Sequence, residues 1–192
     1  MKEIKSCSVI GLGYIGLPTA ALIADSELKV IGVDLNPKIV NSVNNGEIHI
    51  VEPNLDVLVK KVVQKGYLKA QNKPSESDVF LIAVPTPFKK KESNIPEPNT
   101  DYVISAIDSI ISVLKPGDLI IIESTCPVGT TSLVRDFIAN KINFDINEVY
   151  IAYCPERVIP GKIIKELIEN DRVIGGINTQ SGESAKSFYL MF

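Results

Sequence analysis

A glycine-rich turn near the N-terminus constrains the fold of this chain more than any other feature. Residues 9–16 read Val-Ile-Gly-Leu-Gly-Tyr-Ile-Gly and continue a short apolar run that ends at Ile10. In a G-x-G-x-x-G pattern, Gly11 permits a tight turn out of a strand and Gly13 lets the backbone approach a pyrophosphate. Gly16 lets the following helix pack closely. The pattern therefore predicts a strand, a phosphate-binding turn and a helix, in that order.

An acidic residue follows at the distance that a dinucleotide site requires. Asp34 ends a second apolar run, 23 residues after Gly11, and a carboxylate at this place accepts hydrogen bonds from ribose hydroxyls. The helix, which we expect to start near Tyr14, directs its free N–H groups at the phosphates. Because the carboxylate repels a 2′-phosphate, the pattern predicts NAD rather than NADP as the cofactor.

Short apolar runs alternate with helical patterns along most of the chain. Strands are expected at 6–10, 29–33, 79–84, 119–123, 149–153 and 172–175, and helices at 14–26, 37–45, 54–65, 101–114 and 129–140. The strand runs are nearly continuous in Val, Ile and Leu, as in strands that helices cover on both faces. The alternation predicts an α/β fold of the Rossmann type. This is a doubly wound, mostly parallel sheet with helices on both faces and ligands at the carboxyl ends of its strands.

We predict that residues 1–180 form an NAD-binding domain of this type and that residues 181–192 begin a linker or central helix. The segment 88–98, which contains three consecutive lysines, reads as an irregular insertion. Apolar residues accumulate between Phe188 and Phe192. This accumulation predicts a hydrophobic face that lacks a partner, as in a chain that is part of something longer.

Composition and charge exclude several classes of protein. The 192 residues suffice for one well-buried domain. The formal net charge of −3 argues against a nucleic-acid partner, and no uninterrupted apolar run reaches the ~18 residues of a membrane span. The three cysteines form no C-x-x-C pair, so the sequence predicts a reduced, cytoplasmic protein without a metal site.

Two segments with small hydroxyl residues follow predicted strands. Pro85-Thr86-Pro87 is a stiff exit from a strand, and it either places the Thr86 hydroxyl near the cofactor or is a rigid turn in water. Residues 123–131 read Glu-Ser-Thr-Cys-Pro-Val-Gly-Thr-Thr before a predicted helix. Either Thr125 faces the cofactor, or the segment serves only to cap the helix through Thr130 or Thr131.

A third segment, residues 151–161, follows the fifth predicted strand. It reads Ile-Ala-Tyr-Cys-Pro-Glu-Arg-Val-Ile-Pro-Gly. Its acid and base, Glu156 and Arg157, either bind a substrate or pair with each other as a surface salt bridge.

Taken in this order, the segments resemble the UDP-glucose/GDP-mannose dehydrogenase family, and most closely its UDP-N-acetylmannosamine branch. The resemblance rests on GYIGLPTA at 13–20, GEIHIVEP at 46–53, IAVPTPF at 82–88, ESTCPVGTT at 123–131, IAYCPERVIPG at 151–161 and NDRVIGG at 170–176. Enzymes of this family oxidise the C6 alcohol of a nucleotide sugar to the uronic acid in two steps and reduce two NAD molecules. The resemblance also implies a homo-oligomer for the full-length family, without fixing the state of this chain.

The resemblance implies roles for residues that follow the predicted strands. It implies NAD contacts from Tyr14, Ile15, Asp34, Thr86 and Thr125, and sugar-nucleotide contacts from Arg157 and Val158. Thr125 and Glu156 would lie near the reacting carbon, where Thr125 orients a water and Glu156 acts as a base or holds a water in place.

Two departures from the family pattern bear on substrate and activity. Pro160 stands where UDP-glucose and GDP-mannose dehydrogenases usually carry a second glutamate. The acetylmannosamine branch shares this departure, which favours UDP-N-acetylmannosamine over UDP-glucose or another UDP-sugar.

The family's nucleophile is a cysteine in a Gly-Gly-x-Cys-x-Pro segment, which this sequence does not contain. We do not assign its role to Cys7, Cys126 or Cys154, so we expect the chain alone to be inactive. The alternative is a stand-alone NAD-binding module or a non-catalytic gene remnant. His49, the only histidine, is expected to order its loop rather than to act as a base.

Overall fold

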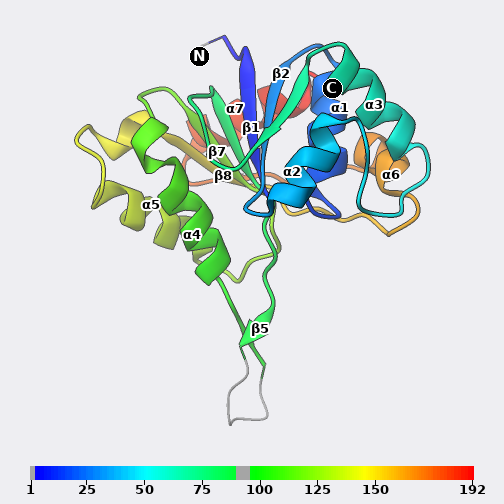
Figure 1. Cartoon of the computed structure of the whole chain (residues 1–192). Coiled ribbons are helices and arrows are strands. Elements are labelled where there is room, and N and C mark those ends of the chain that lie inside the picture. The colour runs from blue at the N-terminus through cyan, green and yellow to red at the C-terminus, as the bar shows by residue number, and fades with distance from the viewer. Residues whose placement is uncertain (1–2, 90–95) are drawn as a thin grey trace.

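The computed structural model describes residues 3–89 and 96–192. These residues form a seven-stranded sheet between layers of helices, and a short two-stranded ribbon projects away from the sheet (Figure 1). The sheet strands are β1 (Ser6–Ile10), β2 (Lys29–Val33), β3 (Leu68–Gln71), β4 (Val79–Ile82), β7 (Leu119–Ile122), β8 (Tyr150–Tyr153) and β9 (Gly175–Gly176).

The strand order is β3-β2-β1-β4-β7-β8-β9. All neighbours pair in parallel except β9, which runs antiparallel to β8. The chain winds outward from β1 to β3, returns to β4, and then winds in the opposite direction. This confirms the predicted Rossmann-type sheet, and it places the point where strand order reverses between β1 and β4. Ligands of such sheets bind at this point, beyond the carboxyl ends of the strands.

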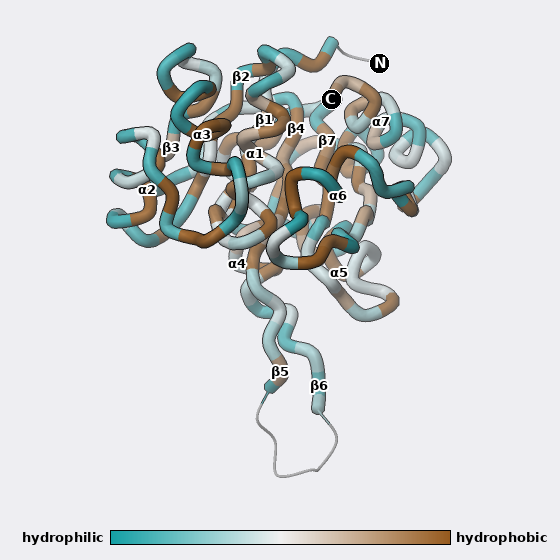
Figure 2. Tube along the Cα trace, turned by 90° about the vertical axis from the view of Figure 1, so that its right-hand side faces the viewer, coloured by the Kyte–Doolittle hydropathy of each residue, from teal (hydrophilic) through white to brown (hydrophobic). Residues whose placement is uncertain are grey.

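Helices cover both faces of the sheet, as predicted. One face packs against α1 (Gly16–Asp25), α2 (Pro37–Asn44), α3 (Leu55–Gln64) and α7 (Thr179–Tyr189), and the other against α4 (Asp101–Ile110) and α5 (Thr130–Ala139). The apolar segments concentrate in the strands and on the helix faces that meet them (Figure 2). Helix α6 (Ile163–Glu169) lies beside α1. No helix within residues 3–89 and 96–192 is long and apolar enough to cross a membrane.

Several elements differ from the sequence expectation. The apolar pattern did not predict β3, an edge strand with an exposed Lys69 between buried neighbours, or the seven-residue α6. The last strand is only Gly175–Gly176, not 172–175. The ends of the supposed irregular insertion are ordered, because β5 (Phe88–Lys89) pairs antiparallel with β6 (Glu97–Pro98). The other two lysines of that segment lie outside the described residues.

Helix α7 packs onto the sheet and does not stand apart from it. Ser181, Ala185 and Phe188 have no exposed surface, and the Ser181 hydroxyl accepts a hydrogen bond from the Ile151 N–H at 3.1 Å. The expectation of an unpartnered apolar face is therefore wrong for Phe188 and its buried neighbour Tyr189. The proposed boundary between residues 180 and 181 stays a prediction.

Helix α1 begins in contact with the turn that follows β1. Gly11 has a φ of +97°, a conformation that a side chain would strain. A Cβ on Gly11 would lie 2.6 Å from the carbonyl oxygen of Ala83, and a Cβ on Gly16 would overlap the carbonyl oxygen of Gly11. The close packing predicted at Gly16 is thus confirmed, and it leaves no room for a methyl group.

A methyl group at Gly16 should destabilise the fold, whereas one at Gly13 should not. No heavy atom of the described residues lies within 4 Å of a Cβ built on Gly13. Since Gly16→Ala forces backbone to move, it should lower the free energy of unfolding by about 1–3 kcal/mol or more. Gly13→Ala should change it by less than about 0.5 kcal/mol. Urea unfolding followed by circular dichroism measures both, and equal midpoints would contradict the packing described above.

Candidate functional site

The residues that the sequence singles out lie on loops that follow five strands. Because these strands are parallel, the loops gather at one edge of the sheet. The glycine turn after β1 carries Gly11, Gly13, Tyr14, Ile15 and Gly16. Single candidates follow the next three of these strands: Asp34 after β2, Thr86 after β4 and Thr125 after β7. The loop after β8 carries Glu156, Arg157 and Val158.

The carboxylate of Asp34 is fixed against the glycine turn. Its Oδ2 accepts a hydrogen bond from the Leu12 N–H at 3.1 Å, and its Oδ1 accepts one from the Asn36 N–H at 2.8 Å. The Asn72 side chain donates to the Asp34 carbonyl at 2.9 Å. A carboxylate has about four acceptor positions, so these bonds leave capacity for a diol.

The start of α1 is open to an anion. The Cβ position of Gly13 faces empty space, and Tyr14 is half exposed. No side chain of the described residues caps the first turn, whose N-cap position is Ile15. The partial positive charge of the helix N-terminus is therefore available to a phosphate.

A cleft of about 320 Å³ lies beside Asp34. The cleft is lined by Leu35, Asn72 and Pro74, together with Tyr102 and Ser105 of α4. Its walls are mainly apolar, and its volume is at the lower end of small-molecule sites. Its place next to the ribose-binding candidate Asp34 suits a flat aromatic base. Local sequence patterns did not single out Asn72, Tyr102 or Ser105, because each is unremarkable within its own segment.

Hydrogen bonds join the loops that carry Thr86 and Thr125. The Ser124 hydroxyl, buried between them, donates to the carbonyl oxygen of Val84 at 2.7 Å. The hydroxyl of Tyr153 accepts a bond from the Cys126 N–H at 3.2 Å. The turn is thus held from both sides, while Thr125 itself is exposed at the surface.

The alternative that Thr130 or Thr131 caps helix α5 is wrong. The N-cap residue is Gly129, with a φ of +92°, and no described side chain caps this helix. The Thr130 hydroxyl instead donates to the carbonyl oxygen of Pro127 at 2.8 Å. It therefore tightens the turn that follows Thr125.

Glu156 forms an ion pair, but not with its neighbour in the sequence. Its Oε1 lies 2.5 Å from Nη1 of Arg172, while Arg157 is exposed and its carbonyl oxygen accepts a bond from Asn170. The alternative of a Glu156–Arg157 surface pair is therefore wrong. Glu156 is held from inside the protein, and the Arg157 side chain is left at the surface.

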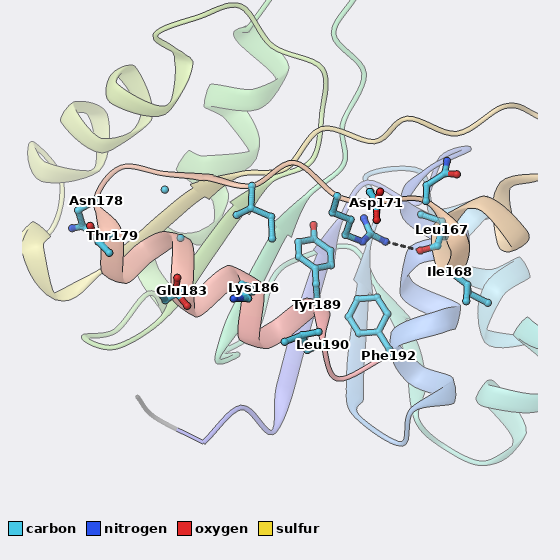
Figure 3. Close-up of a pocket in the computed structure, with 15 residues that line it drawn as sticks. Leu167, Ile168, Asp171, Asn178, Thr179, Glu183, Lys186, Tyr189, Leu190 and Phe192 are labelled. Carbon is cyan, nitrogen blue, oxygen red and sulfur yellow. Dashed lines mark hydrogen bonds between the residues drawn. The ribbon is translucent and has the colours of Figure 1, made fainter.

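Arg172 is the centre of a cluster that sequence reasoning missed. Its guanidinium lies 4.3 Å from the ring centroid of Tyr189, and its Nη2 donates to the Leu167 carbonyl at 3.0 Å, the dashed bond in Figure 3. Its Nη1 is also 4.0 Å from Oε1 of the buried Glu123. A groove of about 910 Å³ opens beside Arg172 and Tyr189, between α6 and α7 (Figure 3).

The three cysteines are free and unsuited to nucleophilic attack. Cys7 and Cys154 are buried, and Cys126 is partly buried. Burial raises the pKa of the Cys7 and Cys154 thiols, and it raises the pKa of Cys126 to about 11. All three are therefore protonated at neutral pH, and the thiolate is the nucleophilic form. No described group of acids, cysteines and the histidine has the arrangement of a metal site.

Glu52 ties the loop that follows Arg157 to the rest of the domain. Its buried carboxylate accepts hydrogen bonds from the Gly161 and Ile163 N–H groups, both at 2.7 Å. The nearby His49 is exposed. Within residues 46–53, Glu52 therefore orders a loop, and that loop, which contains Gly161, is distant in sequence.

A family model described as the NAD binding domain of the UDP-glucose/GDP-mannose dehydrogenase family matches residues 5–192. The chain belongs to this family. Its NAD binding domain is the part that the chain matches, so the cofactor predicted from the glycine turn and Asp34 is confirmed. The open side of Gly13 and the fixed Asp34 carboxylate fit that cofactor.

Individual relatives agree with this assignment. A UDP-N-acetyl-D-mannosamine dehydrogenase of Campylobacter jejuni is 50% identical over 200 residues, which cover 100% of this chain and 48% of the relative. An NDP-N-acetyl-D-galactosaminuronic acid dehydrogenase of Ralstonia nicotianae is 44% identical, with coverage of 99% and 46%. The solved structure of a UDP-D-ManNAc dehydrogenase from Pyrococcus horikoshii superposes with a TM-score of 0.92 at 38% identity, covering 97% of this chain and 44% of that one. The chain thus spans about half the length of the curated relatives it matches.

Replacement of Glu52 should free the loop that follows Arg157. In Glu52→Ala, the amides of Gly161 and Ile163 lose charge-assisted hydrogen bonds worth about 1.5–3 kcal/mol each. Their hydrogen exchange should therefore accelerate at least about tenfold. Glu47→Ala removes an exposed carboxylate from the same segment and should leave both rates unchanged. Unchanged rates in both variants would exclude the loop-ordering role.

Proposed function

We propose that this chain is the NAD-binding part of an enzyme that oxidises UDP-N-acetylmannosamine at C6 to the uronic acid, with reduction of two NAD molecules, for polysaccharide synthesis. The observation that carries the proposal is the Asp34 carboxylate held against the glycine turn, beside the open start of α1. Pro160 and the similarity to UDP-N-acetyl-D-mannosamine dehydrogenases support this substrate over UDP-glucose. The free thiols agree with a cytoplasmic site of action.

In this proposal, different residues around the glycine turn contact different parts of the cofactor. Gly13, Tyr14 and Ile15 face the diphosphate, the free acceptor positions of Asp34 take the ribose hydroxyls, and the 320 Å³ cleft takes the adenine. Thr86 and Thr125, on the two loops that Ser124 joins, contact the nicotinamide end. When bound there, NAD supplies a hydride acceptor.

The sugar nucleotide is assigned to the loop that follows β8. Arg157 is exposed, so its planar guanidinium is available to a phosphate. Val158 adds an apolar contact beside it. Glu156 is fixed by Arg172, and Thr125 is exposed on its own turn. These two side chains suit the positioning of water or a sugar hydroxyl near the reacting carbon.

Replacement of Asp34 tests the cofactor assignment. Asp34→Asn keeps one acceptor oxygen but removes the charge, so NAD affinity should fall by about 1–3 kcal/mol. The preference for NAD over NADP should shrink as well, because the repulsion of the 2′-phosphate is lost. Calorimetric titration with each dinucleotide measures both changes. Asp136→Asn, an exposed aspartate on α5, is the matched control, and equal behaviour of the two variants would contradict the ribose role.

We also expect negligible conversion of UDP-N-acetylmannosamine to the uronic acid when the 192-residue chain is supplied with NAD. Its thiols are protonated at neutral pH, and the second oxidation of the family proceeds through a thiolate nucleophile. The absorbance of NADH over time is the measurement. Steady production that survives replacement of each of Cys7, Cys126 and Cys154 by alanine would show that no thiolate of this chain is needed. Saturable NAD binding without any response to a UDP-sugar would favour a stand-alone binding module.

A further inference from the structure

The carboxyl groups of Glu123 and Glu156 lie near one cation, the guanidinium of Arg172. Glu123 follows β7 and Glu156 follows the adjacent β8, and the Glu156 N–H donates to the Glu123 carbonyl oxygen at 3.4 Å. Arg172 Nη1 is 2.5 Å from Oε1 of Glu156 and 4.0 Å from Oε1 of Glu123. The direct contact with Arg172 therefore belongs to Glu156.

The surroundings of the Glu123 carboxyl group do little to stabilise a negative charge on it. Its side chain has no exposed surface, and the Tyr189 hydroxyl donates a long bond, 3.4 Å, to its Oε1. Its Oε2 has no hydrogen-bond partner within the described part of the chain. An ionised carboxylate with a buried, unpaired oxygen is strongly unfavourable, because the charge loses its hydration without gaining a partner.

The groups that face Glu123 from the surrounding elements do not supply a second cation. They are Cys7 on β1, Thr19 on α1, Cys154 and Glu156 after β8, and Tyr189 on α7. Burial and the negative charge of Glu156 raise the pKa of Glu123 well above its usual range, and Arg172 opposes them only in part. The same environment raises the pKa of Tyr189, so the phenol also stays neutral.

We propose that Glu123 is a neutral carboxylic acid at pH 7 and a positioning residue for Glu156. Glu156, Arg172 and protonated Glu123 then form a unit without net charge. One ion pair satisfies Arg172 and fixes Glu156 at the strand end, and no second carboxylate competes for the guanidinium. The function of Glu156 in this unit rests on the proposed dehydrogenase function, whereas the protonation of Glu123 does not.

Carbon-13 NMR of the chain labelled at the glutamate side-chain carboxyl carbons tests the proposal without substrate or cofactor. One signal of the wild-type chain, identified by its absence in Glu123→Gln, should keep the chemical shift of a protonated carboxyl at pH 7. In Glu156→Gln, Arg172 is free to pair with Glu123, so the midpoint of this signal should fall by at least about one pH unit. Glu183→Gln, an exposed change on α7, should leave the midpoint in place.

An ionised shift for this signal at pH 7, or a midpoint that Glu156→Gln does not lower, would overturn the proposal. Amide spectra establish that each variant is folded. NAD titration of the same samples tests the proposed function separately. If Glu123 titrates as expected in a chain that does not bind NAD, the proposed function fails and this inference stands.

Stability against pH gives a second readout. A carboxyl whose folded pKa lies above its unfolded value favours folding at low pH, and this contribution is lost as pH rises through the folded value. The melting temperature of the wild-type chain relative to Glu123→Gln should therefore fall between about pH 4.5 and pH 7.5. A constant difference across this range would contradict a raised folded-state pKa.

Discussion

Helix α1 meets the turn after β1 so closely that neither contact position accepts a side chain. Gly11 lies against the Ala83 carbonyl and Gly16 against Gly11. This approach brings the N-terminus of α1 to the edge of the sheet where the strand order reverses. The Leu12 N–H then reaches Asp34 at the end of β2. The turn proposed to bind the diphosphate and the acid proposed to bind the ribose are thus positioned by one contact between backbone segments.

The remaining loops are held by buried or partly buried polar groups that connect segments far apart in the chain. Ser124 bonds to the exit of β4, Tyr153 to the turn beside Thr125, and Glu52 to the loop beyond Arg157. Each bond satisfies a backbone donor or acceptor that a loop would otherwise leave unpaired. The exposed side chains proposed to contact ligands therefore stand on loops whose backbones are fixed.

Sequence alone predicted the parts of the structure that depend on local pattern. Continuous apolar runs gave β1, β2 and β7 within one residue, and the glycine spacing gave the turn before α1. The pattern failed for β3, where Lys69 interrupts a short edge strand, and for the seven-residue α6. Both are too short for a periodicity to stand out.

The partners in the ion pairs at the site could not be predicted from local sequence patterns. Glu156 and Arg157 suggested a pair because they are adjacent, yet adjacent residues of an extended chain point to opposite sides. The true partner, Arg172, lies on the loop that leads into β9. The sequence places Glu123 at the end of a predicted strand, but only the fold shows that it is buried beside Arg172 and Tyr189. Such pairings depend on strand order, which no single segment specifies.

We propose that the glycine turn and Asp34 together form the NAD site. A titration of the nitrogen-15-labelled chain with NAD, followed through the amide signals, tests this assignment. The largest shifts should occur between Gly11 and Gly16, at Asp34 and Leu35, and at Asn72 and Ser105 around the cleft. Shifts confined to the groove between α6 and α7, or none at saturating NAD in a folded chain, would contradict the account.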